Sequence, residues 1–102
     1  MPRIVRLTDE ASDDLAAIRR WQTQPGSGAP AKRRVKAILA VLRRLKTMPC
    51  LYPPGDEPGT RQAFCEEHVV VYEVDPDTLD NATAGDVLVL RVFGPGQDRT
   101  TL

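Results

Sequence analysis

Four side chains in the second half of the sequence could neutralise a phosphate or transfer a proton. They are Arg61, His68, Arg91 and Arg99. Arginine stays charged and presents a planar fork of donors that suits phosphate, and the ordinary pKa of histidine lies near neutral pH. Groups of these types can stabilise negative charge that develops during a reaction and can move a proton.

The two strand arginines also have structural interpretations. Arg61 could pair with an acidic neighbour such as Glu73 or Asp86, so structural and functional roles have equal weight for it. Arg91 lies within an apolar run, where a cross-strand ion pair is the expected arrangement.

The other candidates are weighed in the same way. His68 follows a turn, which is typical of a polar residue at the start of a strand. Tyr72 ends an apolar run and is expected in the core. Arg99, beside Asp98 in the tail, is the cation expected to be most exposed to a partner.

Charge is unevenly distributed although the net charge is zero. Residues 1–51 contain eleven basic and four acidic side chains, whereas residues 52–102 contain three basic and ten acidic ones. Such asymmetry predicts either a solvated helix face or a charged partner. The isoelectric point near 6.6 disfavours binding to a dense phosphate surface such as the ribosome. The cations expected to bind a partner are Lys32, Arg33, Lys36, Arg43, Arg44 and Arg99.

Two amphipathic helices are predicted in the first half. A strand over residues 3–8 leads to a first helix, which Thr8 or its neighbour can cap and which ends before Gln24. Pro30 fits the first turn of a second helix, and Pro49 ends it. The apolar stripe of the second helix has the clearest periodicity in the chain and comprises Ala31, Val35, Ile38, Leu42 and Leu45.

Three strands are predicted after a proline-rich loop over residues 48–58. They cover residues 61–65, 68–75 and 87–93, and a long hairpin loop over residues 76–85 joins the last two. The last strand is apolar without interruption, which indicates a central strand covered on both faces. This order predicts an α+β fold of type β-α-α-β-β-β, with a helical hairpin packed on one face of a mostly antiparallel four-stranded sheet.

Composition favours a single domain over residues 1–102. No run approaches the roughly 20 apolar residues that cross a bilayer, and the first residues lack the layout of a secretion signal. We therefore expect a cytoplasmic protein without membrane contact. Cys50 and Cys65 match no metal-ligand spacing and the single histidine offers no ligand set, so neither a metal nor a cofactor is expected. Cys65 is expected to be a small apolar strand residue.

An ordered set of residues resembles the RelE/ParE superfamily of small bacterial toxins. The set begins with Gly59-x-Arg61, and the strand tyrosine Tyr72 follows eleven residues after Arg61. Leu90-Arg91-Val92 and Asp98 come later in the chain. The first half contributes further matches at Thr8, Ala11, Asp14, Leu15, Ile18, Ala31, Ile38, Leu45 and Pro49.

The resemblance implies the toxin of a type II toxin–antitoxin system, neutralised by a cognate antitoxin that wraps the sheet and helices. RelE-like members cut messenger RNA in the ribosomal decoding site with a cluster of basic residues, whereas ParE-like members poison DNA gyrase. The basic face of the second helix would then contact an acidic antitoxin or gyrase. Both a homodimer and a toxin–antitoxin hetero-oligomer are compatible with the family.

Departures from the family pattern favour the ParE-like branch. Members commonly carry an arginine three residues before the strand tyrosine, where this chain has Val69. They also often carry a histidine or a basic segment after the last strand, where this chain has residues 94–97, Gly-Pro-Gly-Gln, and residues 100–102 lack a tyrosine. We therefore expect a ParE-like toxin that acts on gyrase. A RelE-like, ribosome-dependent mRNA endonuclease and a degenerate, non-toxic antitoxin-binding module are the alternatives, so enzymatic activity stays open.

Overall fold

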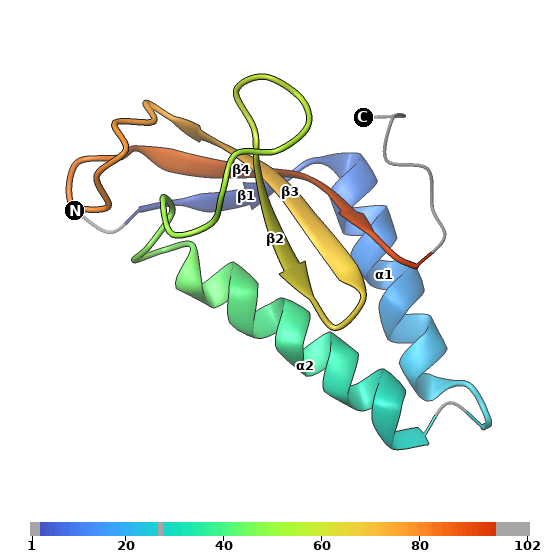
Figure 1. Cartoon of the computed structure of the whole chain (residues 1–102). Coiled ribbons are helices and arrows are strands. Elements are labelled where there is room, and N and C mark those ends of the chain that lie inside the picture. The colour runs from blue at the N-terminus through green and yellow to red at the C-terminus, as the bar shows by residue number, and fades with distance from the viewer. Residues whose placement is uncertain (1–2, 27, 96–102) are drawn as a thin grey trace.

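Two helices and four strands follow one another in the predicted order. The computed structural model describes residues 3–26 and 28–95. Figure 1 shows the helices on the same side of a curved sheet. The elements are β1 (Val5–Leu7), α1 (Asp9–Thr23), α2 (Gly28–Arg44), β2 (Arg61–Cys65), β3 (His68–Asp75) and β4 (Asp86–Phe93).

The helices begin where local chemistry allows. The Thr8 hydroxyl accepts a hydrogen bond from the amide of Ala11 at 3.1 Å, which confirms Thr8 as the cap of α1. Helix α2 begins at Gly28, so Pro30 lies in its first turn as predicted. Gly28 has a φ of +62°, which glycine adopts without a steric penalty. Helix α2 ends at Arg44, and a turn leads from there toward the proline that was expected to end it.

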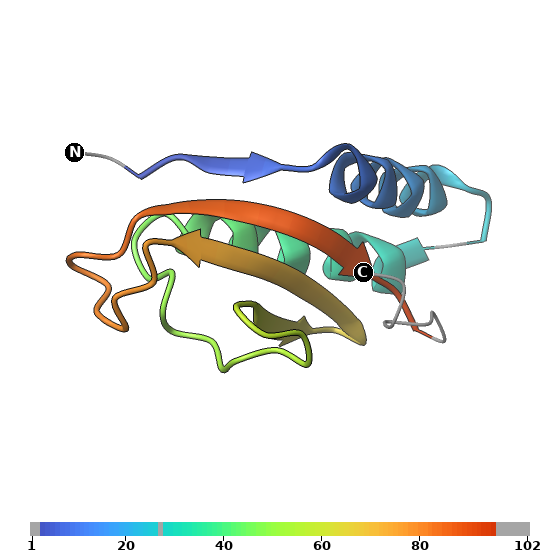
Figure 2. The same cartoon turned by 90° about the horizontal axis from the view of Figure 1, so that it is seen from above.

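The sheet has the order β1-β4-β3-β2, so β4 is a central strand as predicted. Strand β1 pairs with β4 in parallel, while the β2–β3 and β3–β4 pairs are antiparallel. Figure 2 shows β4 curving between β1 and β3. The pairing with β3 shifts between Val71, which faces Arg91, and Tyr72, which faces Val89, so Leu90 is the extra residue of a β-bulge.

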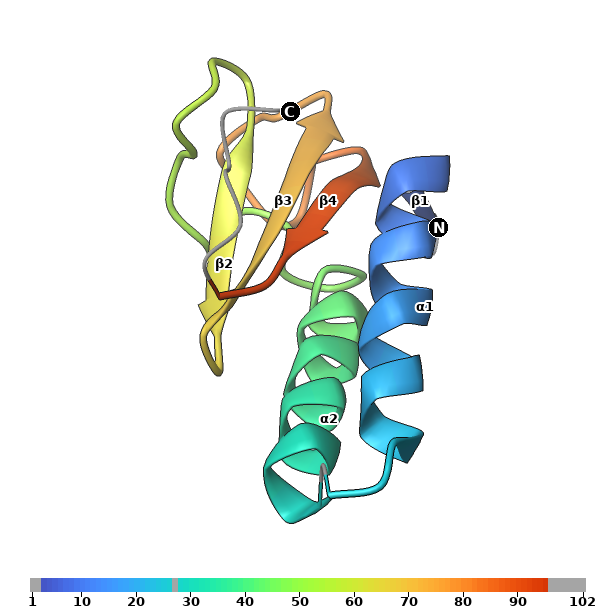
Figure 3. The ribbon, with the colours of Figure 1, turned by 90° about the vertical axis from the view of Figure 1, so that its right-hand side faces the viewer.

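The main core lies between the helical hairpin and the sheet, as Figure 3 shows. Residues Ile38, Val41 and Leu45 of α2 and of the turn after it pack there against alternate residues of the strands. Val41 is buried although the predicted stripe did not include it. A smaller cluster contains Val69, Val71 and Phe93, with Leu90 packed against it.

Candidate functional site

Arg61 is fixed inside the fold by a forked ion pair. Its Nε donates to Oδ2 of Asp77 at 2.8 Å and its Nη2 donates to Oδ1 at 3.0 Å. Its Nη1 donates to the carbonyl of Tyr52 at 2.7 Å. These hydrogen bonds lower the pKa of Asp77. The expected acidic partner is present, but it is Asp77 of the β3–β4 loop instead of Glu73 or Asp86.

Arg91 pairs with helix α1, so the expected cross-strand ion pair is wrong. Its Nε and Nη2 donate to the carboxylate of Asp14 at 2.7 and 3.0 Å, and the amide of Val92 donates to the same carboxylate at 2.9 Å. The guanidinium also stacks on the ring of Phe93, 4.6 Å from its centroid. The bulge at Leu90 shifts the alternation of β4, so that Val92 joins Val89 in the main core while Arg91 lies opposite Val71, on the face of the smaller cluster.

His68 and Tyr72 serve the fold as well. His68 is only 3% exposed at the start of β3, and its Nδ1 lies 3.1 Å from the carbonyl of Glu66. Tyr72 is fully buried, as expected, and its hydroxyl donates to the carbonyl of Pro49 at 2.7 Å. Burial raises the pKa of Tyr72 well above its usual value, so the phenol is a poor proton donor.

Three further positions from the sequence analysis remain, and only Arg99 among them was a catalytic candidate. Val69, where many family members carry an arginine, is 5% exposed within the smaller cluster. Cys65 is half-buried against the main core, as expected, and burial raises the pKa of its thiol. Arg99 lies outside the described residues. Among residues 3–26 and 28–95, no group of acidic, histidine or cysteine side chains could hold a metal ion.

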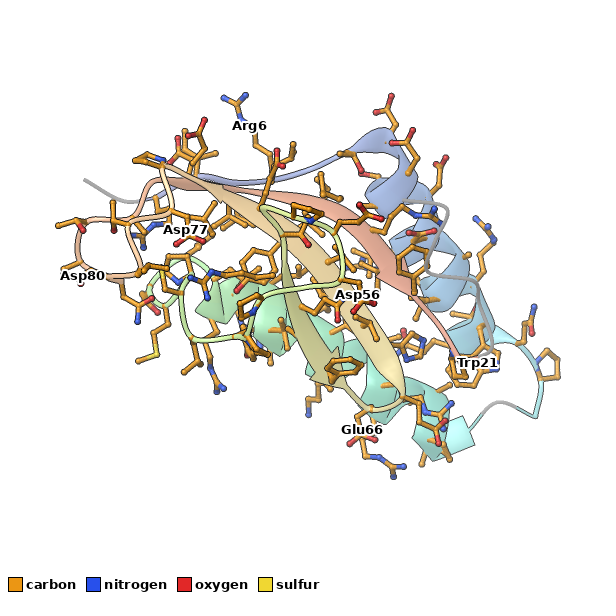
Figure 4. The ribbon with its side chains drawn as sticks, turned by 45° about the horizontal axis from the view of Figure 1, so that its top comes forward. Arg6, Trp21, Asp56, Glu66, Asp77 and Asp80 are labelled. Atoms are coloured by element: carbon orange, nitrogen blue, oxygen red, sulfur yellow. The ribbon has the colours of Figure 1, made fainter. Side chains whose placement is uncertain are left out.

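Part of the basic face of α2 forms ion pairs within the fold. The turn between β2 and β3 consists of Glu66 and Glu67, which pair with Arg33 at 3.5 Å and with Arg34 at 2.7 Å. The guanidinium of Arg34 also lies 5.5 Å from the ring centroid of Trp21. Figure 4 shows Glu66 and Trp21 toward one end of the molecule and Asp77 and Asp80 toward the other. These ion pairs neutralise part of the positive charge of α2 that was expected to contact a partner.

The remaining cations of the first half of α2 meet helix α1 along a groove. This hairpin groove, as we call it, has a volume of about 680 Å³. It brings together three of the predicted partner-binding residues, but Arg43 and Arg44 lie outside it. The lining residues are Arg19, Gln22, Thr23, Lys32, Arg33, Val35, Lys36 and Leu39.

Sequence reasoning missed the contribution of α1 to this groove. Arg19, Gln22 and Thr23 are spaced three and four residues apart, which places them on one face of a helix. That spacing could have shown that the three residues share a face of α1. Only the predicted packing of the two helices as a hairpin could have placed this face next to α2. No helix within the described residues is long and apolar enough to cross a membrane.

The arrangement of helices and strands is similar to that of two solved toxin–antitoxin structures. A chain of the chromosomal ParDE system from P. aeruginosa matches with a TM-score of 0.66 at 18% sequence identity, over 91% of this chain and 96% of that chain. A chain of the RelBE toxin–antitoxin complex from Mycobacterium tuberculosis matches with a TM-score of 0.59 at 22% identity, over 92% and 99% of the two chains. The fold is therefore that of the RelE/ParE-like toxins.

A family model narrows this class. The model described as the ParE toxin of the type II toxin–antitoxin system parDE matches residues 5–98. The match covers nearly the whole sequence, so the chain belongs to the ParE toxin family of the RelE/ParE superfamily. No curated protein sequence matches the chain.

Proposed function

We propose that this ParE-family toxin arrests growth by acting on DNA gyrase, and that a cognate antitoxin neutralises it. Membership of the ParE branch supports the gyrase target. The similar chains were crystallised as parts of toxin–antitoxin systems, which supports the antitoxin partner.

One observation carries the choice between gyrase and messenger RNA. Both arginines of the second half that lie within the described residues, Arg61 and Arg91, give their guanidinium donors to carboxylates of the same chain. A guanidinium held in this way cannot also neutralise a scissile phosphate without leaving a carboxylate unpaired, which is costly when the pair is largely buried. Within the described residues, the second half of the chain contains no other arginine or lysine that could stabilise the charge of a scissile phosphate.

Purified gyrase tests the proposal directly. The chain alone, added to gyrase and relaxed plasmid DNA, is expected to inhibit supercoiling, and its expression in cells is expected to arrest growth and induce the DNA-damage response. The matched control is the chain mixed with the product of the adjacent antitoxin reading frame, which is expected to restore supercoiling.

Translating ribosomes provide the opposing assay. Cuts within codons that appear only when both ribosomes and the chain are present would overturn the gyrase proposal in favour of an mRNA endonuclease. Harmless expression together with tight antitoxin binding would overturn it in favour of a non-toxic binding module.

A further inference from the structure

Four of the five exposed large apolar side chains in the described part of the chain lie at one end of the molecule. They are Ile4, Met48, Leu51 and Leu79, and we call them the apolar end. Figure 1 shows their three segments meeting at the end that lies away from the α1–α2 connection. These segments are the residues before β1, the turn after α2 and the β3–β4 loop. We propose that the apolar end binds a second copy of this chain.

Hydrogen bonds hold the three segments of the apolar end together. The guanidinium of Arg3 donates to the carbonyl of Lys46 at 2.6 Å and to the carbonyl of Asn81 at 2.7 Å. The amide of Cys50, in the turn after α2, donates to the side-chain oxygen of Asn81 at 2.7 Å. The surface is therefore formed before a partner arrives, and binding does not require these segments to become ordered.

Leu79 is the most exposed of the four side chains, at 80%. Its φ of +68° lies in the left-handed region, which leucine rarely adopts. Its amide donates to Oδ1 of Asp77 at 3.1 Å, and Asp77 is in turn held by Arg61. The fold thus fixes a leucine in a costly backbone conformation without burying its side chain. A fixed and exposed apolar side chain of this kind can anchor a contact with another molecule.

Charges of opposite sign flank the apolar end. Exposed cations lie in the last turn of α2 and just after it, whereas exposed carboxylates lie in the β3–β4 loop and at the strand ends that it joins. They are Arg43, Arg44, Lys46, Asp75, Asp80 and Asp86. None of the six forms an ion pair within the described part of the chain. A twofold rotation would place the basic side of one copy against the acidic side of the other, so the surface is complementary to itself.

Other occupants match these charges less well. A nucleic acid or an anionic membrane would be attracted by the cations but repelled by the carboxylates beside them. A uniformly basic protein would meet the opposite repulsion. Because only parts of four apolar side chains are exposed, the contact should bury less than about 1,200 Å² in total, which is typical of weak and reversible association. We therefore expect a dissociation constant of roughly 10–100 μM.

Sedimentation equilibrium of the full chain tests the inference without antitoxin or gyrase. Between about 5 and 500 μM protein, in about 50 mM salt, we expect a monomer–dimer equilibrium. Leu79→Ser is expected to weaken the dimer about tenfold, because it removes the central apolar anchor. Phe64→Ser alters the fifth exposed apolar side chain, on β2, and is expected to dimerise within about twofold of the original chain. Circular dichroism confirms that each variant is folded.

Charge reversal tests whether the surface is complementary to itself. Arg43→Glu/Lys46→Glu makes both sides acidic, and Asp75→Lys/Asp80→Lys makes both sides basic. Each variant alone is expected to dimerise about tenfold more weakly than the original chain. In an equimolar mixture of the two, every contact again joins opposite charges, so association should return to within about threefold of the original value.

Three results would overturn the inference. The first is a chain that stays monomeric throughout this concentration range, and the second is equal dimerisation of Leu79→Ser and the original chain. The third is a mixture of the two charge variants that associates no better than either variant alone. A monomeric chain whose Leu79→Ser variant loses antitoxin binding or gyrase inhibition would assign the apolar end to that partner instead. Because the assay contains only this chain, its failure is distinct from a failure of the supercoiling assay.

Discussion

At the scale of single side chains, Arg61 and Arg91 are each held by a carboxylate of the same chain. The guanidinium of Arg61 satisfies both oxygens of Asp77 and a backbone carbonyl while its side chain is only 9% exposed. Removing one partner of such a pair leaves the other desolvated and uncompensated. The largest effect of altering Arg61 should therefore be on folding.

The first prediction concerns Arg61→Met, which keeps much of the side-chain volume but removes the guanidinium. We expect the free energy of unfolding to fall by about 2–3 kcal/mol, because Asp77 loses its charged donor in a partly buried position. Urea denaturation followed by circular dichroism at pH 7 measures this change. Arg20→Met, at an exposed position, serves as the control and should change stability by less than about 0.5 kcal/mol.

The pH dependence of the same ion pair gives a second prediction. The pKa of Asp77 is lowered from its usual 3.8 by hydrogen bonds from Arg61. The carboxylate therefore contributes stability that is complete above the unfolded pKa and is lost as pH falls through the folded pKa. We expect the stability difference between the original chain and Asp77→Asn to be constant from about pH 5 to 8 and to shrink below about pH 4. A difference that grows toward low pH would contradict this assignment.

Residue types alone could identify Arg61 and Arg91 as candidates but not their partners. Asp77 is 16 residues from Arg61, in a loop, and Asp14 is 77 residues from Arg91, on a helix. Neither distance follows from periodicity, because each pair depends on how the elements pack. The bulge at Leu90, which shifts the alternation of β4, also has no sequence signal such as a glycine.

At the level of elements, helix α1 completes the edge of β4. Strand β1 covers β4 only from Val87 to Val89, and Thr8 then donates through its backbone amide to Val89 and through its hydroxyl to Leu90. Asp14 accepts the amide of Val92 further along. One helix thus satisfies backbone groups that a longer neighbouring strand would otherwise pair with.

This arrangement predicts a local effect of Asp14→Ala. The amide of Val92 loses its acceptor and Arg91 its partner, so we expect the end of β4 to open more readily, by about 2 kcal/mol. Hydrogen exchange measured by NMR should show the Val92 amide exchanging roughly 30 times faster. Asp13→Ala removes an exposed neighbouring carboxylate and should leave that amide protected. Equal protection of Val92 in both variants would rule out this role of Asp14.

The elements themselves were largely predictable. Apolar periodicity located α2, and strands β2 and β3 have the predicted bounds, because each buries one regular face. The alternation of apolar and polar residues cannot predict that β1 pairs with β4 in parallel, because the two strands are far apart in the sequence. Only the family resemblance could indicate this pairing. Pro30 lies in the first turn of α2, as predicted, because the ring of proline suits the first helical turn.

For the whole molecule, the uneven charge of the sequence has two roles. Two of the four ion pairs among the described residues, Arg33–Glu66 and Arg34–Glu67, join basic side chains of the first half to acidic side chains of the second half, so part of the asymmetry holds the fold together. The rest stays on the surface, with free cations along the hairpin groove and acidic residues around the β3–β4 loop. A molecule with zero net charge therefore presents two surfaces of opposite sign.

Ion-exchange chromatography checks this separation of charge. At pH 7 and low salt we expect the chain to be retained on both a cation exchanger and an anion exchanger, because each resin contacts one surface at short range. Elution should need only about 0.1–0.3 M salt, at which the Debye length falls to roughly 10 Å or less. A chain that passes through both columns would show that its opposite charges are too closely mixed to act separately.

The pairing of β1 with β4 also has a consequence for synthesis. These strands contact each other through residues up to 82 positions apart, and β4 is the last strand of the described fold. While translation proceeds, the emerging polypeptide holds a first strand with no neighbour and a helix α1 that lacks its contacts with β4. The sheet can form completely only after β4 has left the ribosome. The surface of the toxin is therefore completed in one late step of its synthesis.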